Sequence, residues 1–280
     1  MPFSILVQAY PKTDVPVAHV QGPILQAMFL NLIKQVDPAV ATRLHDDPGH
    51  RPFTLSPLGV ADEVSTFQGF WLPREQMLRR GTACYLRVTL LDEALFPIFG
   101  RYFLEHVEPG FVLGETEFVI TDVLTMADGR TPWSGYVSYP ELIDRAMQPR
   151  RKLKLAFLTP TSFSQGKIDL PLPLPRLVFQ SYRKRFAQFY QVAFLPDFEA
   201  QVEQHVGIAN LKQIQTRVIQ TKNVTLIGFT GDALFELHPH APPELAFQLN
   251  LLAAYAFFCG TGQKTTLGMG QTILLNNPYP

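Results

Sequence analysis

The predicted strands and helices follow the same order twice along the chain, and this repetition limits the fold more than any other feature of the sequence. In the first half, apolar patterns predict a strand, a helix, a strand region, a second helix and a last strand region, at residues 4–10, 23–35, 53–91, 92–106 and 111–126. A short additional helix at 37–45 has Asp37 as its predicted N-cap and Pro38 at its first position. The order is β-α-β-β-α-β with decoration, which is typical of the ferredoxin-like arrangement.

The second half repeats this order after a short connecting helix at 139–147. Its patterns predict a strand, a helix, two strands, a buried helix and a final strand, at residues 153–161, 176–190, 216–238, 242–258 and 269–275. We therefore predict an α+β protein with two tandem ferredoxin-like (RRM-like) βαββαβ domains, at residues 1–135 and 136–280.

The composition is that of a folded protein outside the membrane. Of the 280 residues, 46% are hydrophobic and 17% are charged, whereas disordered chains have the opposite balance. The two cysteines, Cys84 and Cys259, lie far apart and form neither a disulfide framework nor a four-ligand metal site. We see no signal-peptide pattern and no uncharged apolar run as long as a membrane span, so we expect a cytoplasmic protein without a membrane partner.

The charge is zero in total but unevenly distributed. Residues 1–140 contain 10 Lys and Arg against 15 Asp and Glu, and residues 141–280 contain 14 against 9. The zero net charge argues against a strongly basic nucleic-acid binder. The split of −5 and +5 indicates that an anionic partner would be bound mainly by the C-terminal half.

The segment between the last predicted helix and the last strand is rich in glycine. It contains two Gly-x-Gly pairs, Gly260/Gly262 and Gly268/Gly270, with Lys264 between them. A Walker loop is excluded because no glycine directly precedes the lysine, and a dinucleotide fingerprint is excluded because the strand and the helix are in inverted order. Two interpretations remain open: a helix C-cap with a flexible connection, or a loop whose free backbone N–H groups and lysine bind an anion.

The glycine spacing "GTG-QKTTL-GMG" closely resembles the C-terminal signature of the CRISPR-associated endoribonucleases that process repeat-containing precursor RNA, in the RAMP superfamily. Weaker similarities to the same family occur at residues 40–58, 153–163 and 226–237, so that the resemblance covers most of the chain. The resemblance implies tandem ferredoxin-like domains, in agreement with the element order, and an RNA substrate.

A histidine and an arginine follow the short helix at 37–45. The imidazole of His45 can take or give a proton, and the guanidinium of Arg51 can stabilise extra negative charge on a phosphate. The resemblance places the active-site histidine of the family on His45; without it, His45 reads as an ordinary helix-terminal histidine. The family often has lysine where Arg51 stands, and members with a catalytic tyrosine carry it about where Leu30 lies. Whether His50 or His19 assists stays open.

The remaining candidates are basic residues that could contact RNA phosphates. The densest clusters lie near 150 and 184, and an ordinary solvated surface is the alternative for both. Together with the loop, the predicted RNA-binding residues are Gly260, Gly262, Lys264, Gly268, Gly270, Arg150, Arg151, Lys152, Arg183 and Arg185. No metal ligands are predicted.

These observations predict an endoribonuclease that needs no metal or other cofactor and cuts CRISPR repeat RNA. RNA carries its own nucleophile, the 2′-hydroxyl, so the products would be a 2′,3′-cyclic phosphate and a 5′-hydroxyl. The main alternative is a non-catalytic RNA-binding subunit of a CRISPR effector complex, and a third is an unrelated enzyme on the same fold. Other effector subunits and a second copy of the chain are further candidate partners.

Overall fold

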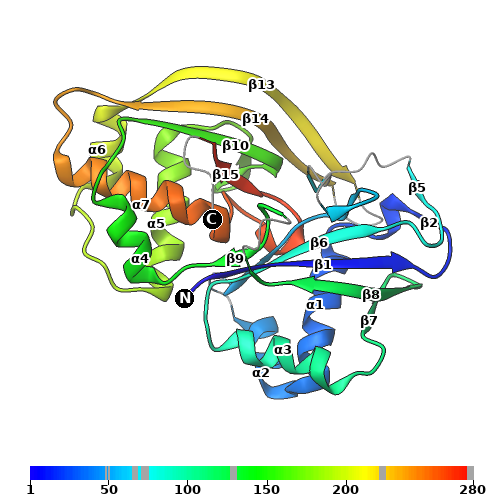
Figure 1. The fold of residues 1–280 in the computed structure, drawn as a ribbon. Helices are drawn as coiled ribbons and strands as arrows, with labels where there is room; N and C mark the ends of the chain where they lie inside the picture. Colours follow the sequence, from blue (N-terminus) through cyan, green and yellow to red (C-terminus); the bar gives the residue numbers. More distant parts are fainter. Residues whose placement is uncertain are drawn as a thin grey trace.

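The N-terminal half forms an antiparallel sheet (Figure 1). The computed structural model describes residues 1–47, 49, 51–64, 69–70, 76–126, 131–220 and 225–275. The main strand order is β3 (Phe53–Leu55), β6 (Cys84–Leu90), β1 (Phe3–Pro11), β8 (Thr116–Leu124) and β7 (Gly110–Leu113). Two short strands extend this sheet, β4 (Gly59–Val60) beside β6 and β9 (Gly135–Tyr136) beside β1. A separate pair is formed by β2 (Val15–Pro16) and β5 (Met77–Leu78). Residues 65–73 of the predicted strand region at 53–91 fall largely outside the described residues.

This sheet is accompanied by the helices α1 (Pro23–Val36), α2 (Pro38–Asp46) and α3 (Leu95–Glu105) (Figure 1). The apolar spacing in α1 correctly predicted its buried face, because Leu25, Phe29, Leu32 and Ile33 all lie in the core. Asp37 is the N-cap of α2, and its carboxylate accepts a hydrogen bond from the backbone N–H of Val40 at 3.0 Å.

The C-terminal half contains a second antiparallel sheet, in the order β13 (Val206–Gln220), β14 (Thr225–Leu237), β10 (Lys152–Thr161) and β15 (Thr272–Leu274). Counted along the chain, the four main strands are β1, β3, β6 and β8 in the N-terminal half and β10, β13, β14 and β15 in the C-terminal half. In both sheets these strands lie side by side in the order second, third, first, fourth. This shared topology confirms the tandem ferredoxin-like fold.

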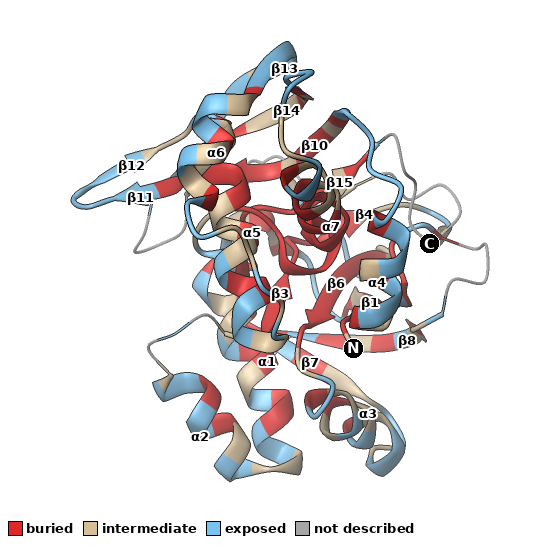
Figure 2. Cartoon of the chain, turned by 90° about the vertical axis from the view of Figure 1, so that its left-hand side faces the viewer, coloured by how far each residue is buried: buried red, intermediate tan, exposed pale blue. Residues whose placement is uncertain are grey.

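The C-terminal half contains the helices α4 (Tyr139–Ala146), α5 (Pro175–Phe189), α6 (Phe198–His205) and α7 (Pro243–Cys259). Helix α7 is apolar on all sides and buried along most of its length, and Figure 2 shows it in the centre of the protein. The hydrophobic core around α7 also contains Leu6, Tyr85 and Leu91 of the N-terminal half, so side chains of both halves pack together in this core. Among the described residues, no helix combines the length and the apolar character that crossing a membrane requires.

The structure adds elements that the sequence patterns missed. A small hairpin, β11 (Phe163–Gln165) and β12 (Ile168–Leu170), follows β10, and α6 precedes β13. Strand β13 begins at Val206, ten residues before the expected start at 216. The early part of β13 lies at the edge of the sheet with nearly all its side chains exposed, so it lacks the alternation that identifies a half-buried strand.

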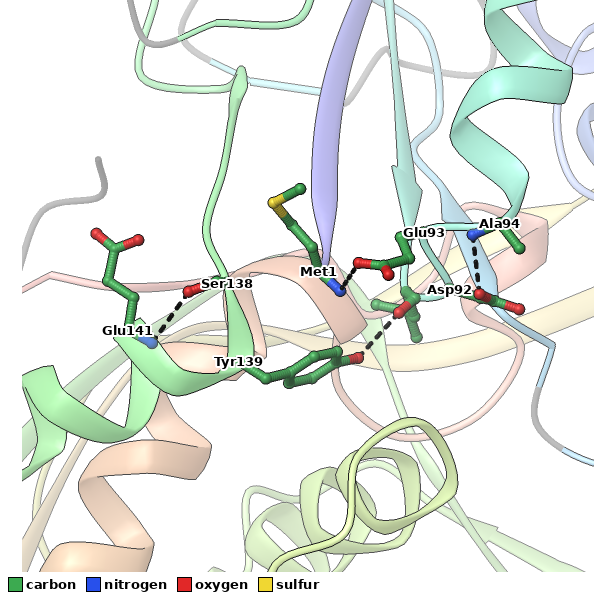
Figure 3. A network of polar contacts seen from close by, with 8 residues as sticks. Met1, Asp92, Glu93, Ala94, Ser138, Tyr139 and Glu141 are labelled. Carbon is green, nitrogen blue, oxygen red and sulfur yellow. Dashed lines mark hydrogen bonds and ion pairs between the residues drawn. The ribbon is translucent and has the colours of Figure 1, made fainter.

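The chain passes between the two halves at the N-terminus of α4 (Figure 3). The Tyr139 hydroxyl donates to the carbonyl oxygen of Leu91, just after β6, at 2.9 Å, and Ser138 caps α4 by accepting from the N–H of Glu141. Strand β9 contains the predicted boundary at 135/136 and still pairs with β1, whereas α4 contacts α7. The position of the boundary stays a prediction.

Candidate active site

A pocket of about 380 Å³ lies between the two halves of the chain. The N-terminal half contributes Gln26 of α1 together with Gly49 and Arg51 after α2, and the C-terminal half contributes β11, α5 and the glycine-rich segment. Its basic side chains are those of Arg51, Lys184, Arg185 and Lys264, and no acidic residue lines it in the part of the chain that the structure describes. This charge distribution suits an anionic ligand.

The glycine-rich segment, residues 260–270, is a tightly folded loop. Each of its four glycines has a positive φ, between +64° and +93°. A Cβ atom on Gly270 would lie 2.1 Å from the carbonyl oxygen of Thr261, and one on Gly262 would lie 2.2 Å from that of Ser162. The glycines are therefore required by backbone conformation and by close packing of the loop.

The backbone N–H groups of this loop have partners within the protein. The N–H of Gly260 donates to Ala256 O in the last turn of α7 at 2.9 Å, which confirms the predicted helix C-cap. Gly270 donates to Pro160 at 3.0 Å, and Gly262 donates to the Ser181 hydroxyl at 3.3 Å. These three amides are not free to bind a ligand, which corrects the expectation of a cradle of free N–H groups and of a flexible connection.

The loop also reaches the N-terminal half. The Thr266 hydroxyl donates to the side-chain oxygen of Gln26 at 3.0 Å, and the Gln271 amide donates to the carbonyl of Leu55 at 3.1 Å. A Cβ atom on Gly268 would lie 3.2 Å from the ring of Pro57. The loop therefore connects the two halves, and its segment 262–267 forms one wall of the pocket.

Side chains from both halves bind the last carbonyl groups of α7, next to the loop. Arg87 of β6 donates to Phe257 O at 2.6 Å, and the neighbouring Thr89 donates to Phe258 O at 2.7 Å. Arg185 of α5 donates to Cys259 O at 2.7 Å and to the carbonyls of Gly260 and Gly262. A helix C-terminus carries partial negative charge, so it stabilises the two guanidinium groups, which have no ion-pair partner among the described residues.

Arg185, whose side chain comes from α5, consequently stabilises the glycine-rich loop. Its side chain is 5% exposed, although it borders the pocket, and its donors are directed at loop carbonyls. Its direct contact with RNA stays a prediction. Burial lowers the pKa of Arg87 to about 9, which leaves that guanidinium charged at neutral pH.

His45 lies in the last turn of α2, where the helix ends as predicted. Its Nδ1 is 2.9 Å from Oδ1 of Asp46, and its side chain is 71% exposed. A carboxylate can only accept a hydrogen bond, so this contact places the proton of the neutral ring on Nδ1 and leaves Nε2 as a proton acceptor. His45 itself is not among the lining residues of the pocket.

Arg51 links His45 to the pocket. Its Nε donates to Leu44 O and its Nη2 donates to His45 O, both at 3.1 Å, so the guanidinium binds the C-terminus of α2. The same side chain lines the pocket with Lys184 and Lys264. The structure therefore brings Arg51 and the glycine-rich loop together at one pocket. His45 lies next to Arg51, on the side of the pocket that the N-terminal half forms.

Of the other candidates, His19 and Leu30 do not line this pocket. His50 lies outside the described residues, and His19 is exposed in a 3-10 turn that does not line the pocket. Leu30 is partly buried against the N-terminal core, as an apolar side chain would be.

The predicted basic clusters divide according to their surroundings. Arg151 donates to Leu237 O and Pro239 O, Lys152 lies 3.4 Å from Glu236, and Arg183 pairs with Glu199. None of these residues, nor Arg150, lines the pocket.

Lys184, by contrast, is exposed and lines the pocket, although it was not among the RNA-binding residues predicted from the basic cluster near 184. Its signal was helical spacing, because the pocket-lining positions 177, 180, 181 and 184 of α5 follow the i, i+3, i+4, i+7 pattern of one face. Gln26 had no comparable signal, since only the folded loop brings Thr266 to it.

Replacing Gly270 with alanine is expected to destabilise the protein strongly. Alanine at a positive φ costs about 1–2 kcal/mol in itself, and the 2.1 Å contact with Thr261 O adds displacement of the backbone. Gly166 is the matched control, because it has a φ of +67° but no atom within 4 Å of the position that a Cβ would take. Urea unfolding should show a larger loss for Gly270→Ala than for Gly166→Ala, and equal losses would contradict the packing argument.

Comparisons with known proteins agree with this arrangement. A family model described as the CRISPR Cas6 N-terminal domain matches residues 1–144, and one described as CRISPR-associated endoribonuclease Cas6 matches residues 155–272. A curated CRISPR-associated endoribonuclease Cas6 of Mycobacterium tuberculosis (strain CDC 1551 / Oshkosh) is 30% identical over 121 residues, which are 43% of this chain and 38% of that relative. The match thus spans well under half of the relative's length.

Solved structures are similar over nearly the whole chain. A Cas6 product complex has a TM-score of 0.80 and 29% identity, and it covers 98% of this chain and 99% of that one. Thermus thermophilus Cas6 has a TM-score of 0.73 and 27% identity, with 98% of each chain covered. A second Cas6 product complex has a TM-score of 0.74 and 28% identity, with 98% of this chain and 99% of that chain covered.

Proposed function

The chain belongs to the Cas6 family of CRISPR-associated proteins, and from this premise we propose that it is an endoribonuclease that cuts CRISPR repeat RNA. The observation that carries the proposal is the pocket between the two halves, where Arg51, Lys184 and Lys264 meet and no described residue of the lining is acidic. Two similar structures are product complexes, and a third is described as a substrate mimic complex.

In the proposed mechanism, the 2′-hydroxyl before the scissile phosphate attacks that phosphate. Nε2 of His45 takes the proton of the hydroxyl or, in the charged ring, gives a proton to the 5′-oxygen that leaves. Arg51 and Lys184 stabilise the negative charge that develops on the phosphate oxygens. Asp46 supports this role because its contact with Nδ1 orients the imidazole.

Cleavage in the presence of EDTA tests the chemistry. Because the nucleophile belongs to the RNA and the proton transfers belong to the protein, we expect the rate to stay within about twofold when EDTA is added. The products should carry 2′,3′-cyclic phosphate and 5′-hydroxyl ends, and an RNA with 2′-deoxyribose at the scissile position should stay intact. Loss of activity in EDTA that Mg²⁺ restores, or cutting of the deoxy substrate, would contradict this mechanism.

A non-catalytic RNA-binding subunit of an effector complex is the second candidate function. One observation favours it: His45 is not among the lining residues of the pocket. Tight binding of repeat RNA without any product would support this function over cleavage. Binding of other effector subunits or of a second copy of the chain is a further proposal, which light scattering with and without RNA would test.

A further inference from the structure

The β11–β12 hairpin projects from the body of the protein (Figure 2), and the residue before it, Ser162, contacts the glycine-rich loop. Its base is fixed, because Gln263 N–H donates to Ser162 O at 3.0 Å and Phe163 is 5% exposed. Its far end is exposed, with Ile168 at 70%. A two-stranded hairpin is marginally stable by itself, so the exposed part can shift at low cost while the base remains in place.

Lys264 faces this hairpin from the loop. It has a φ of +56°, in the left-handed region that a lysine rarely adopts. The backbone is held there because Leu267 N–H and Met269 N–H both donate to Lys264 O, at 2.9 and 3.4 Å. A lysine at this φ is unfavourable for the backbone, so its presence at the pocket suggests that the position requires the lysine side chain.

The Lys264 side chain meets a carboxylate of the hairpin. Nζ of Lys264 lies 3.6 Å from Oδ2 of Asp169, which is on β12, and the two side chains are 36% and 44% exposed. Among the described residues, no other basic residue that lines the pocket forms an ion pair. Asp169 does not line the pocket, so it neutralises Lys264 from outside.

We propose that Asp169 competes with RNA phosphate for Lys264 and thereby sets the affinity of the pocket for RNA. This inference rests on the proposed function. In the RNA-free protein the carboxylate lies beside the ammonium group. A phosphate that binds Lys264 either breaks the lysine–aspartate pair and loses its energy, or lies close to the Asp169 carboxylate and is repelled by it, so RNA binding is weakened in both cases.

A double-mutant cycle measures this competition. The protein, Asp169→Asn, Lys264→Gln and the double variant are titrated with a fluorescent repeat RNA of the host array, which carries 2′-deoxyribose at the scissile position so that binding is measured without cutting. Glu105→Gln is the matched control, because it removes one carboxylate from a surface ion pair, at 3.1 Å from Arg101 and 48% exposed, on α3.

Asp169→Asn should tighten RNA binding by about two- to fivefold, the range of an exposed ion pair, and the dependence of affinity on salt should become steeper. In the Lys264→Gln background the same change should have no more effect than Glu105→Gln. An Asp169→Asn affinity equal to that of Glu105→Gln, or an equal gain in both backgrounds, would overturn the inference alone. Absence of RNA binding by the unaltered protein would overturn the proposed function and the inference with it.

Discussion

Replacing His45 with alanine is expected to slow cleavage of repeat RNA by about 10²- to 10⁴-fold, the usual contribution of a positioned acid or base. RNA affinity should change little, because the side chain is 71% exposed and does not line the pocket. The stability of the fold should change by less than about 0.5 kcal/mol, as is usual at exposed positions. Single-turnover cleavage with the enzyme in excess separates the chemical step from binding and from product release.

The matched control for this experiment is His19→Ala. His19 is another exposed histidine of the N-terminal half, and it does not line the pocket. The control should cleave at the rate of the unaltered protein. A His45→Ala variant that also cleaves at the full rate would show that the proton transfer belongs to another group, and cleavage abolished together with RNA binding would show that His45 holds the RNA.

Replacing Arg87 with methionine is expected to lower the free energy of unfolding by about 3–5 kcal/mol, because each buried acceptor left without a donor costs about 1–3 kcal/mol. Arg87 is 1% exposed and donates to Ser4 Oγ at 2.7 Å, to Gln271 Oε1 at 2.8 Å and to Phe257 O. Methionine has a similar length and keeps most of the packing, but it donates no hydrogen bond. It also removes positive charge from the C-terminus of α7.

Urea denaturation followed by far-ultraviolet circular dichroism measures this loss. Arg43→Met is the control, because Arg43 is an exposed residue of α2 and the substitution is chemically identical. It should change the stability by less than about 0.5 kcal/mol. If Arg87→Met is as stable as the control, the hydrogen bonds of Arg87, including those to Gln271 and Phe257 in the C-terminal half, do not stabilise the fold.

The sequence predicted the elements that bury one regular face. The four apolar positions of α1 and the continuous apolar run of α7 identified both helices, and Asp37 marked the start of α2, since a cap is a local interaction. The exposed early part of β13 and the hairpin at 163–170 were missed. Their formation depends on backbone pairing with other segments, which leaves no periodic pattern in exposed side chains.

The candidate site was predicted in its parts and not in its assembly. Glycine spacing singled out the loop at 260–270, but it suggested free amides where the structure has internal hydrogen bonds. Arg185 was grouped with surface cations, whereas its position in α5 directs it to the carbonyls at the end of α7. Sequence spacing within one helix cannot reveal a partner that lies more than seventy residues away in the chain.

What the sequence determined by itself was the order of the elements, the turns that need glycine, and the residue types able to move a proton or bind a phosphate. These depend on interactions between neighbours along the chain, such as capping, periodic burial and backbone conformation. The tertiary structure decided which charges are available to a ligand. Arg87 and Arg185 are enclosed at the end of α7, Lys264 is paired with Asp169, and Lys184 lines the pocket, because long-range packing sets the solvation and the partners of each charge.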